Sequence, residues 1–193
     1  MATLIVVAAS ARVARAQEHD HQKMNARGEQ AMGFDQMATI HHFILYEDGG
    51  AIEVTVKDRA DKKNLAAIRS HLPHIVQAFG KGDFSDPAFV HDVGVPGTET
   101  MARLRDRIGY KYEDIRDGGR VRISTRHART LSAVHEFLRF QIQDHKTGDS
   151  LEVTRPPKDR SEKFPVTSCQ FKGTPHWNSA TFSFNWQLAT GNW

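Results

Sequence analysis

The sequence lacks several features that would assign it to a familiar class. It has a single cysteine, Cys169, so no disulfide can form within the chain. Its apolar N-terminal stretch is too short to span a bilayer, and no stable membrane insertion is expected. Neither sign of charge dominates, because 26 basic and 23 acidic residues are interleaved along the chain. That balance gives no basic block, and we expect no nucleic-acid partner.

Diagnostic catalytic motifs are also missing. No G-x-S-x-G, H-E-x-x-H, Walker or Rossmann pattern is present. Ser124-Thr125-Arg126 with Arg129-Thr130 loosely resembles the phosphate loop of carbamoyltransferases, which grips carbamoyl phosphate. Those enzymes need two α/β domains totalling about twice the size of this one, and Thr125 is more simply explained as a helix cap. We therefore do not expect an enzyme, and a carbamoyltransferase-like phosphate binder is only a remote alternative.

The N-terminus has the pattern of a signal peptide. Residues 1–11 are mostly apolar, and Ala14-Arg15-Ala16 places small residues at the −3 and −1 positions of a cleavage site before Gln17. An ordinary N-terminal strand or helix is the alternative interpretation. With residues 1–16 as a signal peptide, the predicted localisation is periplasmic or secreted.

Residues 17–40 form a polar leader rich in histidine and methionine, with a short helix predicted over residues 22–32 and ended by Gly33. After cleavage, His19 would be the third residue of the mature chain. A histidine in that position lets the terminal amine, two backbone amides and the imidazole bind Cu(II) in a square plane. A disordered polar leader is the alternative.

Two similar segments follow. Strands are predicted over residues 41–46 and 51–56, on either side of Asp48-Gly49-Gly50, which is typical of a type I′ hairpin turn. A helix with an apolar stripe is predicted over residues 62–79, with a kink expected at Pro73. Strands around Asp117-Gly118-Gly119 and a helix over residues 128–144 then repeat this order.

The repetition predicts the fold class. When the two hairpins are aligned at their second glycine, Phe43 becomes equivalent to Tyr112 and Ile52 to Val121. We expect an α+β domain over residues 41–149, made of two ββα pseudo-repeats at 41–83 and 109–149. They should form one four-stranded antiparallel sheet with both helices on one face, plus the N-terminal helix.

Two segments lie outside these repeats. Residues 83–97 are predicted to be a long connection, and connections of that length inside a compact domain are often functional. Residues 150–193 are predicted to be a linker and tail, with alternating residues 181–188 that could form either an edge strand or an exposed segment.

A set of motifs resembles a family of small uncharacterised exported bacterial proteins. They are Met32-Gly33-Phe34-Asp35-Gln36, His41-His42-Phe43, Asp48-Gly49-Gly50, His71-Leu72 with His74-Ile75, and the run from His135 to Ile142. The resemblance covers about residues 19–149 and implies export and the domain limits. It lends no catalytic residues, because that family has no established activity.

Clustered histidines and methionines are the main functional signal. Three of the five methionines lie between residues 24 and 37, and seven of the eleven histidines lie between residues 19 and 91. Imidazole and thioether groups are ligands that copper and zinc favour. We expect copper or zinc to bind through the histidines of the first repeat, with these candidates: His41, His42, His71, His74, His91 and, at the N-terminus, His19.

The spacing of these histidines limits which of them can share a metal. His41 and His42 point to opposite faces of a strand, whereas His71 and His74 are neighbours on a helix surface. Convergence of three of the five domain histidines would favour a metal site. Dispersed histidines would favour the competing hypothesis, a metal-free binding or interaction module that holds a small molecule or protein. His135 and His145 are interpreted as structural, because neither has a second histidine at a ligand spacing.

Overall fold

The computed structural model describes residues 22–157. The predicted signal peptide, His19, Cys169 and the alternating residues 181–188 lie outside these described residues. Residues 22–32 are helical, as expected from the sequence, and Gly33 follows them with a left-handed φ of 74°.

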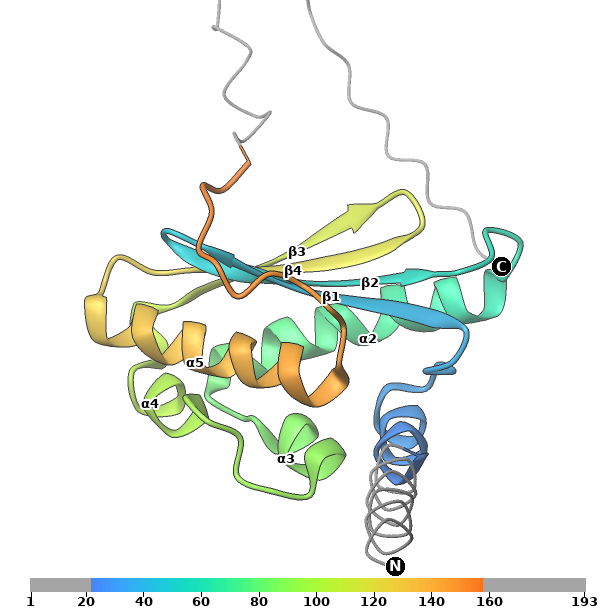
Figure 1. The fold of residues 1–193 in the computed structure, drawn as a ribbon, viewed down its shortest axis with the longest axis horizontal. Coiled ribbons are helices and arrows are strands. Elements are labelled where there is room, and N and C mark those ends of the chain that lie inside the picture. The colour runs from blue at the N-terminus through green and yellow to red at the C-terminus, as the bar shows by residue number, and fades with distance from the viewer. Residues whose placement is uncertain (1–21, 158–193) are drawn as a thin grey trace, which may run out of the picture. The chain divides into compact units, whose positions relative to one another are not determined.

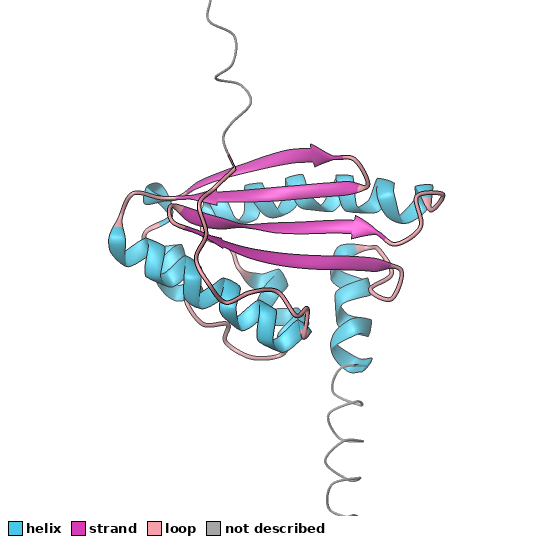
Figure 2. Cartoon of the chain, turned by 45° about the horizontal axis from the view of Figure 1, so that its top comes forward, coloured by secondary structure: helices cyan, strands magenta, loops and turns pink. Residues whose placement is uncertain are grey.

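The four strands form one antiparallel sheet, which confirms the predicted α+β class. They are β1 (Thr39–Tyr46), β2 (Gly49–Val56), β3 (Gly109–Ile115) and β4 (Gly118–Ser124). The order in the sheet is β1-β2-β4-β3, so the second strand of each hairpin lies in the centre (Figure 2).

The two hairpins share the register that the repeat predicts. Phe43 pairs with Ile52 in the first hairpin, and Tyr112 pairs with Val121 in the second. The turns differ from the prediction by one residue, because Tyr46 pairs with Gly49 and the turn residues are Glu47 and Asp48. Neither has a positive φ, so a type I′ turn centred on Asp-Gly is not formed.

Two long helices cover one face of the sheet (Figure 1). Helix α2 (Lys62–Lys81) begins at the Asp61 cap and ends at Gly82, and α5 (Ala128–His145) begins at a His127 cap. The predicted Thr125 cap is therefore corrected: Thr125 donates its hydroxyl to Arg107 O and accepts from His127 N. Helix α2 packs chiefly beneath β3 and β4, whereas α5 packs beneath β1 and β2.

The core lies between the sheet and these two helices. Inward-facing strand residues meet the apolar stripes of α2 and α5, and each fully buried large side chain stabilises the fold by about 1.5–3 kcal/mol. The largest fully buried core side chains include Phe34, Leu45, Ile68, Phe79, Val121, Ile123, Phe137 and Leu138.

The connection between the repeats contains short helices that the sequence did not indicate. These are α3 (Ser85–His91), α4 (Thr98–Arg103) and a 3₁₀ turn, η1 (Arg105–Arg107). Neither α3 nor α4 has a side-chain cap, and each is too short to show a helical period. Gly97 allows α4 to approach α5, because a Cβ there would lie 2.1 Å from Ala133 O.

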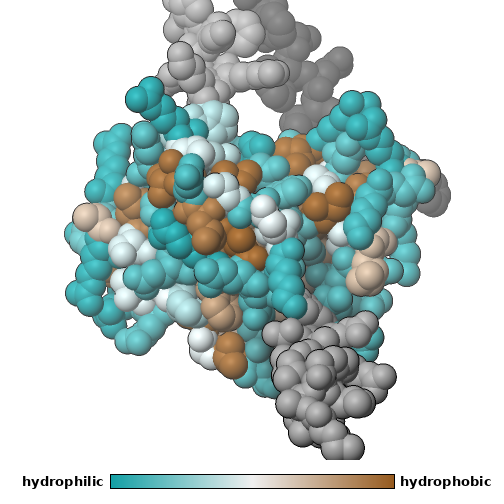
Figure 3. Space-filling model, in the orientation of Figure 1, coloured by the Kyte–Doolittle hydropathy of each residue, from teal (hydrophilic) through white to brown (hydrophobic). Residues whose placement is uncertain are grey.

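The other face of the sheet carries its own ion pairs. Arg120 Nε lies 2.7 Å from Glu53, and its Nη1 lies 3.2 Å from Glu113. The surface that the described residues present in the orientation of Figure 1 has no single large apolar area: in Figure 3, hydrophobic residues lie in small groups among hydrophilic ones. Thr154 forms a parallel bridge with Tyr46 at the β1 edge, so part of the predicted linker is paired with the sheet. Within residues 22–157, no helix is long and apolar enough to cross a membrane.

Candidate functional site

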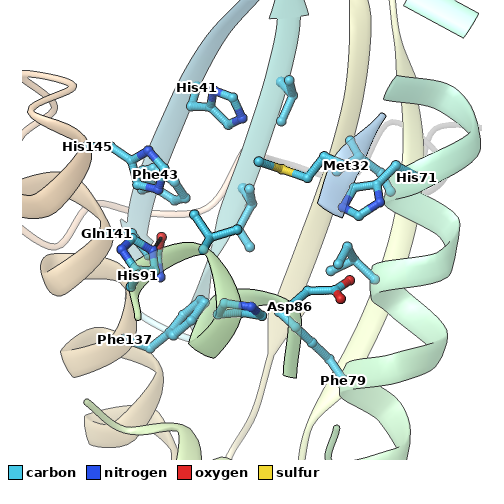
Figure 4. A pocket seen from close by; sticks show the side chains of 16 residues that line it. Met32, His41, Phe43, His71, Phe79, Asp86, His91, Phe137, Gln141 and His145 are labelled. Carbon is cyan, nitrogen blue, oxygen red and sulfur yellow. Dashed lines mark hydrogen bonds between the residues drawn. The ribbon is translucent and has the colours of Figure 1, made fainter. Parts of the chain in front are cut away.

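A cavity of about 70 Å³ lies between the sheet, α2, α3 and α5. Its wall is mostly apolar, with residues contributed by both repeats and by the connection between them (Figure 4). The polar or sulfur-containing residues that line it are Met32, His41, His71, Asp86, His91, Gln141 and His145. Four histidines therefore meet at one cavity, although only three of them were predicted as ligands. We call it the histidine-lined cavity.

His41 reaches this cavity because it points to the core side of β1 with Phe43, whereas His42 points to the other face, as the predicted alternation requires. Its ring lies 5.9 Å from the Phe34 ring and 5.7 Å from the His145 ring. The buried Nε2 atom has no hydrogen-bond partner. A buried polar atom of this kind costs about 1–3 kcal/mol when it stays unpaired.

The surroundings of His41 keep its ring neutral. Burial lowers the pKa of His41 from its ordinary value to about 4, and the neighbouring His42 and His71 add to this effect. At neutral pH one ring nitrogen therefore carries a lone pair that can accept a hydrogen bond or bind a metal.

His71 and His74 lie on neighbouring positions of α2 but have different surroundings. His71 is half-buried at the cavity, where burial lowers its pKa. The His74 side chain is 65% exposed, and its Nε2 lies 3.9 Å from Asp86. The two ring centroids are 6.2 Å apart. Only His71 lines the histidine-lined cavity.

His42 has a separate structural contact. Its Nδ1 lies 2.7 Å from Asp149 Oδ1, and Asp149 also accepts hydrogen bonds from Phe43 N and the Thr147 hydroxyl. Burial alone would raise the pKa of Asp149, but these hydrogen bonds outweigh it and lower the pKa. The carboxylate thus fixes the chain after α5 to β1.

His91 joins α3 to α5. Its Nδ1 lies 2.5 Å from Asp144 Oδ2, and its Nε2 lies 3.0 Å from Gln141 Oε1. The side chain is only 2% exposed, and its ring meets the Phe140 and His145 rings edge to face. Because both ring nitrogens have partners, His91 holds the wall of the cavity and does not offer a free donor atom.

Met32 and His145 also line the cavity, although the sequence analysis named neither as a candidate ligand. Met32 comes from the end of the N-terminal helix, and Figure 4 shows its side chain extending between His41 and His71. His145 was interpreted as structural because it has no histidine at a ligand spacing. It reaches the cavity because α5 packs beneath β1, and that tertiary contact has no sequence signal.

The predicted ligands do not form a conventional metal centre. Residues 22–157 contain no group of three or more His, Cys, Asp or Glu residues placed to hold a metal ion. His41, His71 and His91 line the same cavity, whereas His42 and His74 do not. Copper or zinc binding through these histidines therefore stays a prediction.

Comparison with known proteins identified no relative of this chain. The chain matches no protein-family model, no curated protein and no solved structure. The predicted resemblance to exported bacterial proteins therefore stays a prediction, and the function has to be argued from the histidine-lined cavity.

Proposed function

We propose that this domain is a binding module whose ligand occupies the histidine-lined cavity and contacts His41 Nε2. The observation that carries this proposal is a buried, unpartnered nitrogen at an otherwise mostly apolar cavity. A ligand that pairs with this nitrogen would offset the cost of burying it without a hydrogen-bond partner. An apolar pocket with few polar groups is the usual form of a small-ligand site.

The size of the cavity restricts the ligand. A volume of about 70 Å³ is roughly half that of an engineered apolar cavity of about 150 Å³ that admits benzene. It is also well below the range of about 300–1,000 Å³ that holds drug-sized molecules. The ligand is therefore an ion, a molecule of a few atoms, or the small end of a larger one.

Binding explains the lining better than catalysis does. The cavity wall contains no serine, threonine, cysteine or lysine that could act as a nucleophile. The His91 and Asp144 pair has the form of an oriented base, but the remaining nitrogen of His91 is bonded to Gln141. With the predicted signal peptide, such a module would act in the periplasm or outside the cell.

Thermal unfolding with defined probes tests the proposal. Cu(I), Zn(II), ethanol and acetamide are added to the full chain, to His41→Leu and to the matched control His74→Leu. At a probe concentration of about 100 times Kd, the free energy of unfolding should rise by about 2.7 kcal/mol. We expect at least one probe to raise Tm in the native chain and His74→Leu but not in His41→Leu. If no probe gives a His41-dependent shift, the proposal is wrong.

A further inference from the structure

Three neutral donor groups lie around one part of the histidine-lined cavity. The His41 and His71 rings are each 5.9 Å from the Phe34 ring, so both pack around the same side chain. Figure 4 shows the Met32 thioether between the two histidines. The three donors come from β1, α2 and the N-terminal helix, and only the fold brings them together.

The donor types point to a soft metal ion. Thioether ligands select Cu(I), and imidazole suits copper as well. Cu(I) also accepts few ligands, so it does not need the larger group of His, Cys, Asp or Glu residues that is absent from residues 22–157.

The charge of the ion decides which metal the apolar cavity favours. The cost of moving an ion from water into an apolar site rises with the square of its charge, so a divalent ion costs about four times as much as a monovalent one. The one carboxylate in the cavity wall, Asp86 of α3, lies 3.9 Å from His74 Nε2 and also acts electrostatically on His71. His41, His71 and Met32 add no negative charge, which disfavours Zn(II) and Cu(II).

Met32 is placed so that its sulfur can adjust. It ends the helical residues 22–32, and the next residue, Gly33, has a left-handed φ of 74° with open space around it. The unbranched methionine side chain has three rotatable bonds and a polarisable sulfur. A second hollow beside the N-terminal helix shares Met32 and His71 with the cavity, so both residues lie between the two spaces.

We infer that the histidine-lined cavity binds one Cu(I) ion through His41 Nε2 and the Met32 sulfur, with His71 as the third ligand. The inference rests on the proposed binding function and names its ligand. His91 remains outside the coordination sphere, because both of its nitrogens have hydrogen-bond partners.

Anaerobic competition with a chromogenic Cu(I) chelator tests this site in the full chain. All samples carry His19→Ala, so that the predicted N-terminal copper site does not contribute. We expect His41→Leu and Met32→Leu each to weaken Cu(I) binding by more than about 100-fold, beyond the effect of losing an outer-shell partner. The matched controls are Met37→Leu and His74→Leu, whose native side chains are exposed. They should stay within threefold of the parent (roughly 0.65 kcal/mol).

Folding and ligand identity are checked separately. Met32→Leu nearly conserves volume and should cost less than about 1.5 kcal/mol of stability, so loss of Cu(I) from this variant is not an effect of unfolding. X-ray absorption of the Cu(I) form should show a sulfur ligand that disappears in Met32→Leu.

The outcomes distinguish this inference from the proposed function. Equal Cu(I) affinity in the parent, His41→Leu and Met32→Leu would overturn the Cu(I) site, as would Zn(II) binding as tight as Cu(I). If Cu(I) fails while ethanol or acetamide gives a His41-dependent rise in Tm, the binding function stands and only the ligand is wrong. If every probe fails, both proposals fall.

Discussion

Replacing His135 by leucine should lower the free energy of unfolding by about 2 kcal/mol. This side chain reaches from α5 to the β1–β2 hairpin and is only 9% exposed. Its Nε2 lies 2.9 Å from Tyr46 O and 3.0 Å from Gly49 O. Because both partners are acceptors, Nε2 carries the proton and one N–H is shared by two carbonyl groups.

The magnitude follows from what leucine leaves behind. A buried polar group that loses its partner costs about 1–3 kcal/mol, and here a single donor is removed from two carbonyls. Leucine keeps the site apolar and filled, so the cost of a cavity is small. The carbonyls belong to the residues on either side of the turn, so the loss should loosen the hairpin against α5.

Urea unfolding at neutral pH measures this effect. His74→Leu is the matched control, because its native side chain is 65% exposed and its replacement should change stability by less than about 0.5 kcal/mol. His135→Gln retains an N–H donor and should recover part of the loss. A His135→Leu protein as stable as the native chain, or one no less stable than His135→Gln, would refute the role of this hydrogen bond.

Three further changes test other parts of the fold. Gly50→Ala should cost about 1–3 kcal/mol, since its Cβ would lie 2.2 Å from Leu138 Cδ1; a thermal melt unchanged from the native chain would contradict this. Asp149 has a lowered pKa, so its stabilisation is present above the pKa of the unfolded carboxyl and is lost as pH falls through the folded value. Asp149→Asn should therefore be less stable than the native chain at pH 7 and should lose less stability when the pH is lowered. Urea unfolding curves of the two proteins that shift equally between neutral and acidic pH would contradict this. Arg120→Met leaves Glu53 and Glu113 without their shared cation, although Lys111 Nζ still lies 3.3 Å from Glu113, and should cost about 1 kcal/mol at low salt. Arg126→Met is the matched control, because the native Arg126 is exposed.

The regular elements could be predicted from the sequence because their signals are local. Alternating apolar residues around Asp-Gly pairs specify each hairpin, and apolar stripes specify α2 and α5. The turn residues were displaced by one position, because Tyr46 pairs with Gly49 and Glu47 enters the turn. Backbone pairing determines that boundary, and the Asp-Gly signal alone did not locate it.

The candidate site was only partly predictable. The strand alternation separated His41 from His42, whereas His71 and His74, expected as neighbours on one helix surface, differ in that only His71 lines the cavity. Met32 and His145 were not connected to this site, because their contacts depend on how the N-terminal helix and α5 pack against the sheet. Short uncapped helices such as α3 also leave no periodic signal, although α3 supplies part of the cavity wall.

The crossed packing of the helices bears on how the chain folds. Each hairpin is covered chiefly by the helix of the other unit, so a fragment that ends before β3 would leave the apolar face of α2 without its main surface. Residues 22–97 and 98–157, made as separate chains, should each remain largely unfolded. Mixed together, they should regain structure by complementation, and the intact domain should unfold in one cooperative transition. A single ββα unit whose helix packs on the hairpin of another unit would need a second copy of itself to bury the apolar face of that helix.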